Sequence, residues 1–361
     1  MSPSARQPAP PLWHQCRLTA CALLMGALAA CSGSDSTVTD RTFLAFSTTV
    51  RLTIVGATPE AAATAGDELE RLLLTASKDW YAFGDGELAA VNEQLSLGLP
   101  AKVSPNLAPL IARAIELHGQ SQGLFDPAVC AMVALWQFDR EEALAVATGP
   151  PADADIQALR ERQGGMSDLR FDGRTLTPRR PLCLDLGGMA KGTALERART
   201  LLVKLGITNA LLDIGGSSQL TLGENRIRPW RIGLKDPRSS AVLGTLTLAP
   251  GETASTSGDY ERSYVRDGRR YHHILDPRLG KPTTNSASVT VIGRDGELTD
   301  AASTALMVGG LERFLDLCAA LGIDDAMLIT TTGVLRATPS LRARLLRDNG
   351  GPLPGMEAED L

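Results

Sequence analysis

The sequence is poor in the residues on which many metal and haem proteins depend. Its 361 residues include only four histidines and six cysteines, and no C-x-x-C pair occurs among them. These absences argue against a zinc finger, an iron–sulfur protein and a c-type haem protein. Aromatic residues make up only 4% of the chain, so a cofactor with flat rings would find few side chains to stack against.

No charge of one sign dominates the chain. It contains 36 Lys and Arg against 41 Asp and Glu, a net charge of −5, without a block of like charge. Proteins that bind nucleic acid non-specifically show a basic excess or stripe, so we expect no nucleic-acid partner. The apolar fraction of 43% is that of an ordinary globular protein. The length allows two or three domains, or one large domain with a tail.

The first thirty residues are typical of an export signal. Residues 18–30 carry no charge, and this run is too short to cross the ~30 Å hydrocarbon core of a bilayer as a helix. The run leads into L-A-A-C at 28–31, which resembles the bacterial lipobox. We therefore expect 1–30 to be a cleaved signal peptide, Cys31 to be lipidated and 31–41 to be a polar tether. The protein would then be anchored at the periplasmic face of a cell-envelope membrane, with inner or outer membrane left open.

Besides the lipidated Cys31, three cysteines remain after such processing. Cys130, Cys183 and Cys318 are widely spaced and have apolar neighbours. An exported protein can form a disulfide, but an odd number leaves one thiol unpaired within the chain. We interpret all three as small buried hydrophobic side chains.

Helices and strands follow one another in an irregular order along the rest of the chain. Periodicity and capping residues predict helices from Pro59, from Pro105, within 139–165, over 188–205, from Thr299, over 311–321 and over 340–348. Strands are predicted over 42–55, Leu169–Phe171 and 182–185, several times within 208–256, and over 288–293 and 326–330. This order favours an α+β fold of mixed or antiparallel sheets packed with helices over a regular βαβ alternation.

Two predicted strands end in paired glycines. Asp185 closes one strand before Gly187-Gly188 and a helix that carries Lys191, and LDIGG at 212–216 repeats the form. A glycine turn before a helix exposes backbone N–H groups and a partial positive charge, which suits a phosphate. The spacing matches neither a P-loop nor G-x-G-x-x-G. Taken alone, these glycines are equally compatible with close helix–strand packing.

Basic and imidazole side chains gather in residues 253–282. His272 and His273 are adjacent, so in an extended backbone only one of them can face a given site. An imidazole with an ordinary pKa of about 6.5 can orient or deprotonate a nucleophile. The D-G pair at 267–268 predicts a surface hairpin over 265–271.

Asp300 and Thr304 are four residues apart on a predicted helix and therefore share a face. A carboxylate and a hydroxyl are hard oxygen donors, which suit Mg²⁺ better than zinc. An aspartate near a helix N-terminus is also a common cap. Together with two glycine turns and a histidine-bearing basic loop, however, this pair fits a Mg²⁺–pyrophosphate ligand.

Six segments carry a resemblance to a known family. They occur in order as GLFDPAV at 123–129, DLGGMAKG at 185–192, LDIGG at 212–216, TSGDYER at 256–262, HHILDPRLGKP at 272–282 and TDAASTAL at 299–306. In this set the chain resembles the ApbE family of FAD:protein FMN transferases, many of which are bacterial lipoproteins. Since the motifs are spread along the chain and concern one ligand, we expect a single catalytic domain over 42–348 and a flexible tail at 349–361.

The resemblance implies a Mg²⁺-dependent reaction with FAD as substrate. A threonine hydroxyl of an acceptor protein would attack the FMN-side phosphorus, and AMP would leave. One alternative keeps the site but uses water, giving an FAD pyrophosphatase that yields FMN and AMP. Another is a non-catalytic flavin-binding lipoprotein, against which Asp185, Asp300 and Thr304 argue, because flavin storage needs no metal.

The resemblance also assigns roles to particular residues. Asp300, Thr304 and the backbone carbonyl of Gly188 match the metal ligands. His273 matches the histidine of the H-I-x-D-P segment and is assigned near the pyrophosphate as orienting group or base. Asp185 is assigned to catalysis with it, Asp276 supports the loop, and His272 is structural. The FAD contacts carried over are Leu124, Phe125, Asp126, Asp185, Lys191 and Ile274.

Three positions depart from the family pattern. Phe46-Ser47-Thr48 stands where relatives often have Met-Gly-Thr, so Phe46 would replace a methionine contact to the flavin. Gly86 replaces the serine of a Ser-Glu-Leu segment that an aromatic residue commonly precedes in the family. Tyr81 or Phe83 would be the aromatic side chain that contacts the flavin ring, and we assign Tyr81. Ser217 replaces an aspartate that often follows the second glycine pair, and this leaves the role of that turn in FAD binding open.

Overall fold

An eight-stranded sheet runs through the computed structural model, which describes residues 37–139, 149–225 and 228–356. Contacts group Val38–Leu361 into one compact unit. Every strand pairs antiparallel with its neighbours. The strands, in spatial order, are β1 (Val38–Ala45), β2 (Thr48–Val55), β6 (Ala210–Ile214), β7 (Ser218–Leu222), β10 (Thr253–Gly258), β15 (Ser286–Gly293), β16 (Asp325–Thr330) and β17 (Leu335–Ala337).

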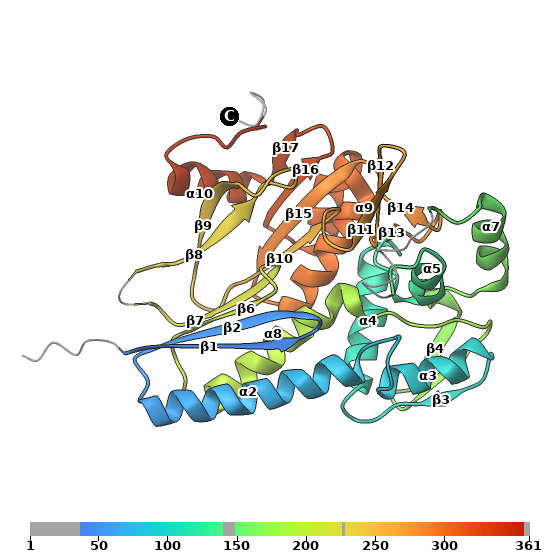
Figure 1. Ribbon diagram of the computed structural model, residues 1–361, viewed down its shortest axis with the longest axis horizontal. Coiled ribbons are helices and arrows are strands. Elements are labelled where there is room, and N and C mark those ends of the chain that lie inside the picture. The colour runs from blue at the N-terminus through green and yellow to red at the C-terminus, as the bar shows by residue number, and fades with distance from the viewer. Residues whose placement is uncertain (1–36, 140–148, 226–227, 357–361) are drawn as a thin grey trace, which may run out of the picture. The chain divides into compact units, whose positions relative to one another are not determined.

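Helices cover the sheet and pack on one another (Figure 1). α2 contacts β1 and α8, while α9 contacts α8, β10, β15 and β16. The α2 helix begins where Thr58 accepts a hydrogen bond from the Ala61 amide, with Pro59 in its first turn. The helices are α2 (Pro59–Asp79), α3 (Glu87–Ser96), α4 (Ala108–Gln120), α5 (Cys130–Leu135), α7 (Asp153–Arg162), α8 (Gly187–Lys204), α9 (Gly296–Leu321) and α10 (Pro339–Asn349), with short 3₁₀ turns at Pro127–Val129 and Met166–Asp168.

Smaller sheets complete the unit. One has three strands, β3 (Ala101–Lys102), β5 (Thr175–Pro178) and β4 (Leu169–Phe171). The others are two-stranded and pair β8 (Trp230–Lys235) with β9 (Val242–Leu248), β11 (Ser263–Arg266) with β12 (Arg269–His272), and β13 (Leu275–Asp276) with β14 (Lys281–Pro282). The predicted α+β class with antiparallel sheets is confirmed, as is the surface hairpin over 265–271.

Two predicted strands differ in the structure. The single strand over 42–55 is a hairpin, because Phe46 and Ser47 adopt φ of 54° and 55° and reverse the chain. Residues 182–185 form no strand. There the Asn92 side chain accepts from the Leu184 amide and donates to the Leu184 carbonyl, both at 2.8 Å, and so replaces a strand partner.

The edges of the unit also differ from the predicted boundaries. β1 begins at Val38, so part of the predicted tether lies in the sheet. In the predicted tail, Leu353 is buried and the Leu335 amide donates to the Gly355 carbonyl. The signal peptide and Cys31 lie outside the described residues. Among the helices that the structure describes, none is long and apolar enough to span a membrane.

The interpretation of all three cysteines as unpaired buried side chains is wrong for two of them. Cys130 and Cys183 form a disulfide across 53 residues of sequence, with Cα atoms 5.4 Å apart. Cys318 is free and buried, as expected. Spacing could not show this pair, because the two cysteines are brought together only when α5 packs beside the segment before α8.

Candidate functional site

The close crossing of α8 and α9 places the predicted metal ligands. A Cβ atom on Gly192 would lie 2.1 Å from the Gly296 carbonyl oxygen and 2.8 Å from Cβ of Asp300. Only glycine at 192 therefore allows the two helices to approach this closely. The crossing brings the N-terminal half of α8 against the face of α9 that carries Asp300 and Thr304.

Asp300 is 5% exposed and lies against the backbone of α8. Its Oδ2 accepts a hydrogen bond of 2.8 Å from the Gly192 amide. Burial raises the pKa of Asp300 to about 6, although the charge of Lys191 and backbone N–H groups lower it. The carboxylate is thus a buried anion whose charge is only partly balanced by protein groups.

Thr304 and Gly188 face one another across the same crossing. A Cβ atom on Gly188 would lie 3.3 Å from Oγ1 of Thr304. The Oγ atom of Ser257, at the end of β10, is 3.4 Å from Thr304 Oγ1 and 2.7 Å from Ser303 Oγ. The three predicted metal positions therefore belong to one small region rich in oxygen atoms.

Lys191 connects this region to the second glycine turn. Its Nζ donates a 2.6 Å hydrogen bond to Ser217 Oγ, just after Gly215-Gly216. The Ser217 carbonyl accepts from the Thr256 amide at 2.7 Å, so β10 meets the same turn. Ser217 thus binds Lys191 through a neutral hydroxyl, which does not compensate the charge of the lysine.

The β1–β2 hairpin also contacts the second glycine turn, Gly215-Gly216. The Gly215 amide donates to the Thr49 carbonyl at 2.9 Å. Phe46 lies at the tip of that hairpin, with its ring centroid 6.1 Å from that of Trp80. Tyr81 follows Trp80, is 38% exposed, and donates from its hydroxyl to the Asp139 carbonyl. The hairpin that carries Phe46 therefore meets the glycine turn, while the Phe46 ring packs near Trp80 and Tyr81 packs edge-on against Phe83.

The GLFDPAV segment reaches the site through its aromatic ring and its backbone. The buried Phe125 ring packs against Gly188, where a Cβ would lie 3.2 Å from it. The Pro127 carbonyl accepts from the Asp185 amide at 2.7 Å. Asp185 itself accepts from the Gly187 amide at 2.9 Å and so shapes the turn into α8. Leu124 and Ile274 are buried in the core that supports these residues.

His118 fixes this segment, and the sequence did not reveal that role. Its Nδ1 is 3.0 Å from the Phe125 carbonyl oxygen and 3.8 Å from Asp126 Oδ2. Burial raises the pKa of Asp126 although His118 lowers it. His118 thus contacts a predicted FAD segment that lies seven residues further along the chain.

Of the two adjacent histidines, only His273 is available to the site. His272 is 2% exposed and its Nε2 pairs with the Thr283 carbonyl oxygen at 2.8 Å, in agreement with a structural role. The Nδ1 atom of His273 is buried without a hydrogen-bond partner in the described part of the chain. Burial lowers the pKa of His273 well below its ordinary value, and the charges of Arg262 and Lys191 lower it further.

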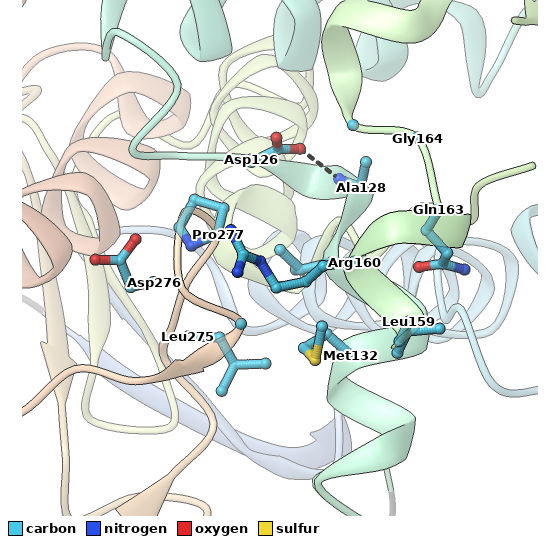
Figure 2. Close-up of a pocket in the computed structure, with 13 residues that line it drawn as sticks. Asp126, Ala128, Met132, Leu159, Arg160, Gln163, Gly164, Leu275, Asp276 and Pro277 are labelled. Carbon is cyan, nitrogen blue, oxygen red and sulfur yellow. Dashed lines mark hydrogen bonds between the residues drawn. The ribbon is translucent and has the colours of Figure 1, made fainter. Parts of the chain in front are cut away.

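A cavity of about 220 Å³ adjoins two of the predicted FAD segments. Figure 2 shows Asp126, bonded to the Ala128 amide, on one side, and Leu275, Asp276 and Pro277 on another. Arg278 pairs with Asp276 at 2.7 Å and holds its carboxylate, which supports the predicted role of Asp276 in the loop. The cavity thus lies between the GLFDPAV segment and the loop that begins at His273.

The residues present fit a magnesium ion better than a transition metal. Within the described ranges, no group of three or more His, Cys, Asp or Glu side chains could hold a metal. Asp300, Thr304 and the Gly188 carbonyl would supply hard oxygen atoms, and phosphate oxygens and water can complete the shell that Mg²⁺ prefers. The buried, incompletely balanced charge of Asp300 would be neutralised by such a cation.

Two glycine turns, a lysine and a buried aspartate thus gather at the helix crossing, an arrangement that suits a phosphate-containing ligand. The chain belongs to the ApbE family, whose family model matches residues 46–327.

Relatives with assigned names are similar over most of this chain. It is 41% identical over 282 residues to the FAD:protein FMN transferase of Rhodobacter capsulatus, which covers 77% of this chain but 53% of that protein. The chain thus spans about half the length of that relative. It is 34% identical to the enzyme of the same name from Vibrio cholerae, over 73% of this chain and 79% of that one. The solved structure of the flavin transferase ApbE from Vibrio cholerae superposes with a TM-score of 0.74 at 29% identity, covering 86% of this chain and all of that one.

Proposed function

We propose that this protein transfers the FMN part of FAD to a threonine hydroxyl of an acceptor protein and releases AMP, with Mg²⁺ as cofactor. The observation that carries the proposal is the meeting of Gly188, Lys191 and Asp300 at one helix crossing, where the charge of Lys191 also acts on His273. The names of the relatives support the same reaction.

The residues have separate tasks in this reaction. The N-terminus of α8 supplies the partial positive charge of the helix dipole to the pyrophosphate, and Lys191 adds a full positive charge. Asp300, Thr304 and the Gly188 carbonyl would hold Mg²⁺, which when bound neutralises charge on the pyrophosphate. The aromatic side chains Phe46 and Tyr81 are proposed to contact the flavin.

The transfer breaks a phosphoanhydride bond of FAD and forms a phosphoester bond to the acceptor. The threonine Oγ bonds to the FMN-side phosphorus while the bond from that phosphorus to the bridging oxygen breaks, and the oxygen leaves with AMP. His273, held neutral by burial, can orient the hydroxyl or accept its proton. Asp185 fixes the turn at which these groups meet. The protein thus acts mainly through positioning and charge.

One assay tests this proposal directly. The full chain is mixed with FAD, Mg²⁺ and an FMN-binding acceptor domain, and flavin fluorescence on the denatured acceptor is measured together with AMP. We expect one AMP per labelled acceptor. Release of AMP and free FMN without labelling would instead establish the pyrophosphatase. Binding of FAD without turnover would establish a flavin-binding protein.

The metal assignment is tested by Asp300→Asn. This change removes the negative charge at nearly constant volume, and we expect transfer to fall at least about a hundredfold. The matched control is Asp316→Asn, an exposed position on the same helix, which should retain full activity. Unchanged transfer by Asp300→Asn at limiting Mg²⁺ would remove Asp300 from the metal site.

We further propose that the protein works at the periplasmic face of a cell-envelope membrane, held by lipid on Cys31. The Cys130–Cys183 disulfide supports export, since disulfides persist in oxidising compartments. Mass spectrometry of the purified chain tests this: an N-terminus at Cys31 carrying acyl chains is expected, and an intact Met1 would contradict it.

A further inference from the structure

The β11–β12 hairpin is a basic surface on an acidic chain. It contains Arg266, Arg269 and Arg270 against one acid, Asp267, a net charge of +2, whereas the whole chain has −5. All three arginines are exposed. The hairpin therefore differs in charge from the molecule that carries it.

The positive charge of this hairpin is largely uncompensated. Arg270 donates to the Ser263 hydroxyl at 3.0 Å, and Arg269 lies 5.1 Å from the centre of the Tyr271 ring. Neither contact involves a carboxylate. Arg266 approaches Asp267 only at 4.0 Å, with both side chains mostly exposed, a geometry that contributes little.

The hairpin is braced and not free to collapse onto the protein. Tyr264 and Tyr271 of the hairpin pack against one another and against Trp136 and Phe138, with centroid separations of 5.3 to 6.2 Å among the four rings. The backbone carbonyl of Phe138 also accepts from Arg262. Aromatic packing of this kind fixes the hairpin backbone that carries the arginines before any partner binds.

The hairpin leads directly into the proposed transfer site. β12 ends at His272, and the next residue is His273, whose amide donates to the Arg262 carbonyl at 3.1 Å. An acceptor threonine that reaches the FMN-side phosphorus must bring its own protein surface beside this hairpin. Val265, 60% exposed on the same hairpin, offers an apolar contact to that surface.

We propose that Arg266, Arg269 and Arg270 form a docking surface for an acidic face of the acceptor protein. The proposal rests on the proposed transferase function. Charges at the rim of an interface act mainly on the rate of association. We expect the three arginines to set the rate at which the acceptor associates, whereas the residues of the helix crossing bind FAD.

The test compares the double change Arg269→Glu/Arg270→Glu with the wild-type full chain. At an ionic strength of about 20 mM, we expect kcat/KM for the acceptor domain to fall at least about tenfold, and the difference to shrink to within about twofold at 500 mM. The affinity for FAD, measured by flavin fluorescence in the absence of acceptor, should stay within about twofold. Neutralising the acidic residues beside the acceptor threonine should produce the same loss.

The chain supplies a matched control. Arg174 follows an Asp172-Gly173 turn between β4 and β5, just as Arg269 follows Asp267-Gly268. Arg174→Glu makes the same kind of charge reversal on an exposed turn and should leave acceptor kinetics unchanged.

Several results would overturn the docking surface. An unchanged kcat/KM for the acceptor would do so, as would an equal loss in FAD affinity, which would assign the arginines to FAD. Loss of binding to phosphatidylglycerol vesicles with unchanged acceptor kinetics would assign them to lipid headgroups. Failure of the wild-type chain to label any acceptor would instead refute the transferase function itself.

Discussion

Single side chains hold the loops of the proposed site in place. The Asn92 side chain forms hydrogen bonds with both the amide and the carbonyl of Leu184, 92 residues away in sequence. It thereby fixes the segment that ends at Asp185. His118 holds the Phe125 carbonyl oxygen in the same manner. A buried amide or imidazole that satisfies backbone groups is costly to remove, because its partners are then left unpaired.

His272 gives a prediction about pH and stability. Burial lowers its pKa below the ordinary value of about 6.5, so below that pH the unfolded chain binds a proton that the folded chain rejects. Stability should therefore fall as the pH falls from 7.5 to 5.5, by up to about 1.4 kcal/mol per pH unit for this group.

The comparison is with His272→Gln, whose amide can still donate to Thr283. Buried carboxylates with raised pKa values, such as Asp126 and Asp300, act in the opposite direction but are common to both proteins. Urea unfolding at each pH should show a shallower loss in the variant. Equal slopes would mean that His272 titrates normally in the folded protein.

At this scale the sequence predicted which groups form the proposed site but not which residues they bond to. Asp300, Thr304, Lys191 and His273 were proposed because their residue types and motifs indicate a chemistry. The bonds from Lys191 to Ser217 and from His118 to Phe125 depend on how distant segments pack, which no local pattern encodes.

At the scale of elements, the crossing of α8 and α9 controls the site. Gly192→Ala would force a methyl group against the Gly296 carbonyl oxygen, 2.1 Å away in the present structure. We expect it to destabilise the fold by about 2 kcal/mol or more and to reduce FMN transfer, because Asp300 must move.

Gly119→Ala is the control for that change. Gly119 lies in α4, and a Cβ atom there would meet nothing within 4 Å. Urea unfolding should show it unchanged or up to about 1 kcal/mol more stable, since alanine favours a helix. If Gly192→Ala and Gly119→Ala had the same free energy of unfolding, the close helix crossing would not require glycine at position 192.

Most elements could be predicted, and the exceptions have local physical causes. The periodicity indicated α8 and the two halves of α9, which do separate at Gly310, where φ is 67°. The β1–β2 turn was missed because Phe46 and Ser47 adopt positive φ without a glycine or asparagine. The α3 helix was not predicted either, and its N-cap, Gly86, provides no capping side chain.

At the scale of the whole molecule, the C-terminal segment closes a second core. Leu353, 4% exposed, packs with Leu341 and Leu345 of α10 and with strands β8 and β9. Leu353→Ala should cost about 2–3 kcal/mol of unfolding free energy. Leu315→Ala, half-exposed on α9, should change it by less than about 0.5 kcal/mol. If Leu353→Ala changed the free energy of unfolding only slightly, residues 350–356 would be a tail that contributes little to the core.

The disulfide has a consequence for how the protein must be made. Cys130 follows the GLFDPAV segment and Cys183 lies two residues before Asp185, so the bond joins two segments that belong to the proposed FAD site. In a reducing host cytoplasm these segments would be synthesised without their covalent link. Oxidative folding thus becomes a step of maturation, and preparations from reducing and oxidising hosts should be treated as different materials until their thiols have been counted.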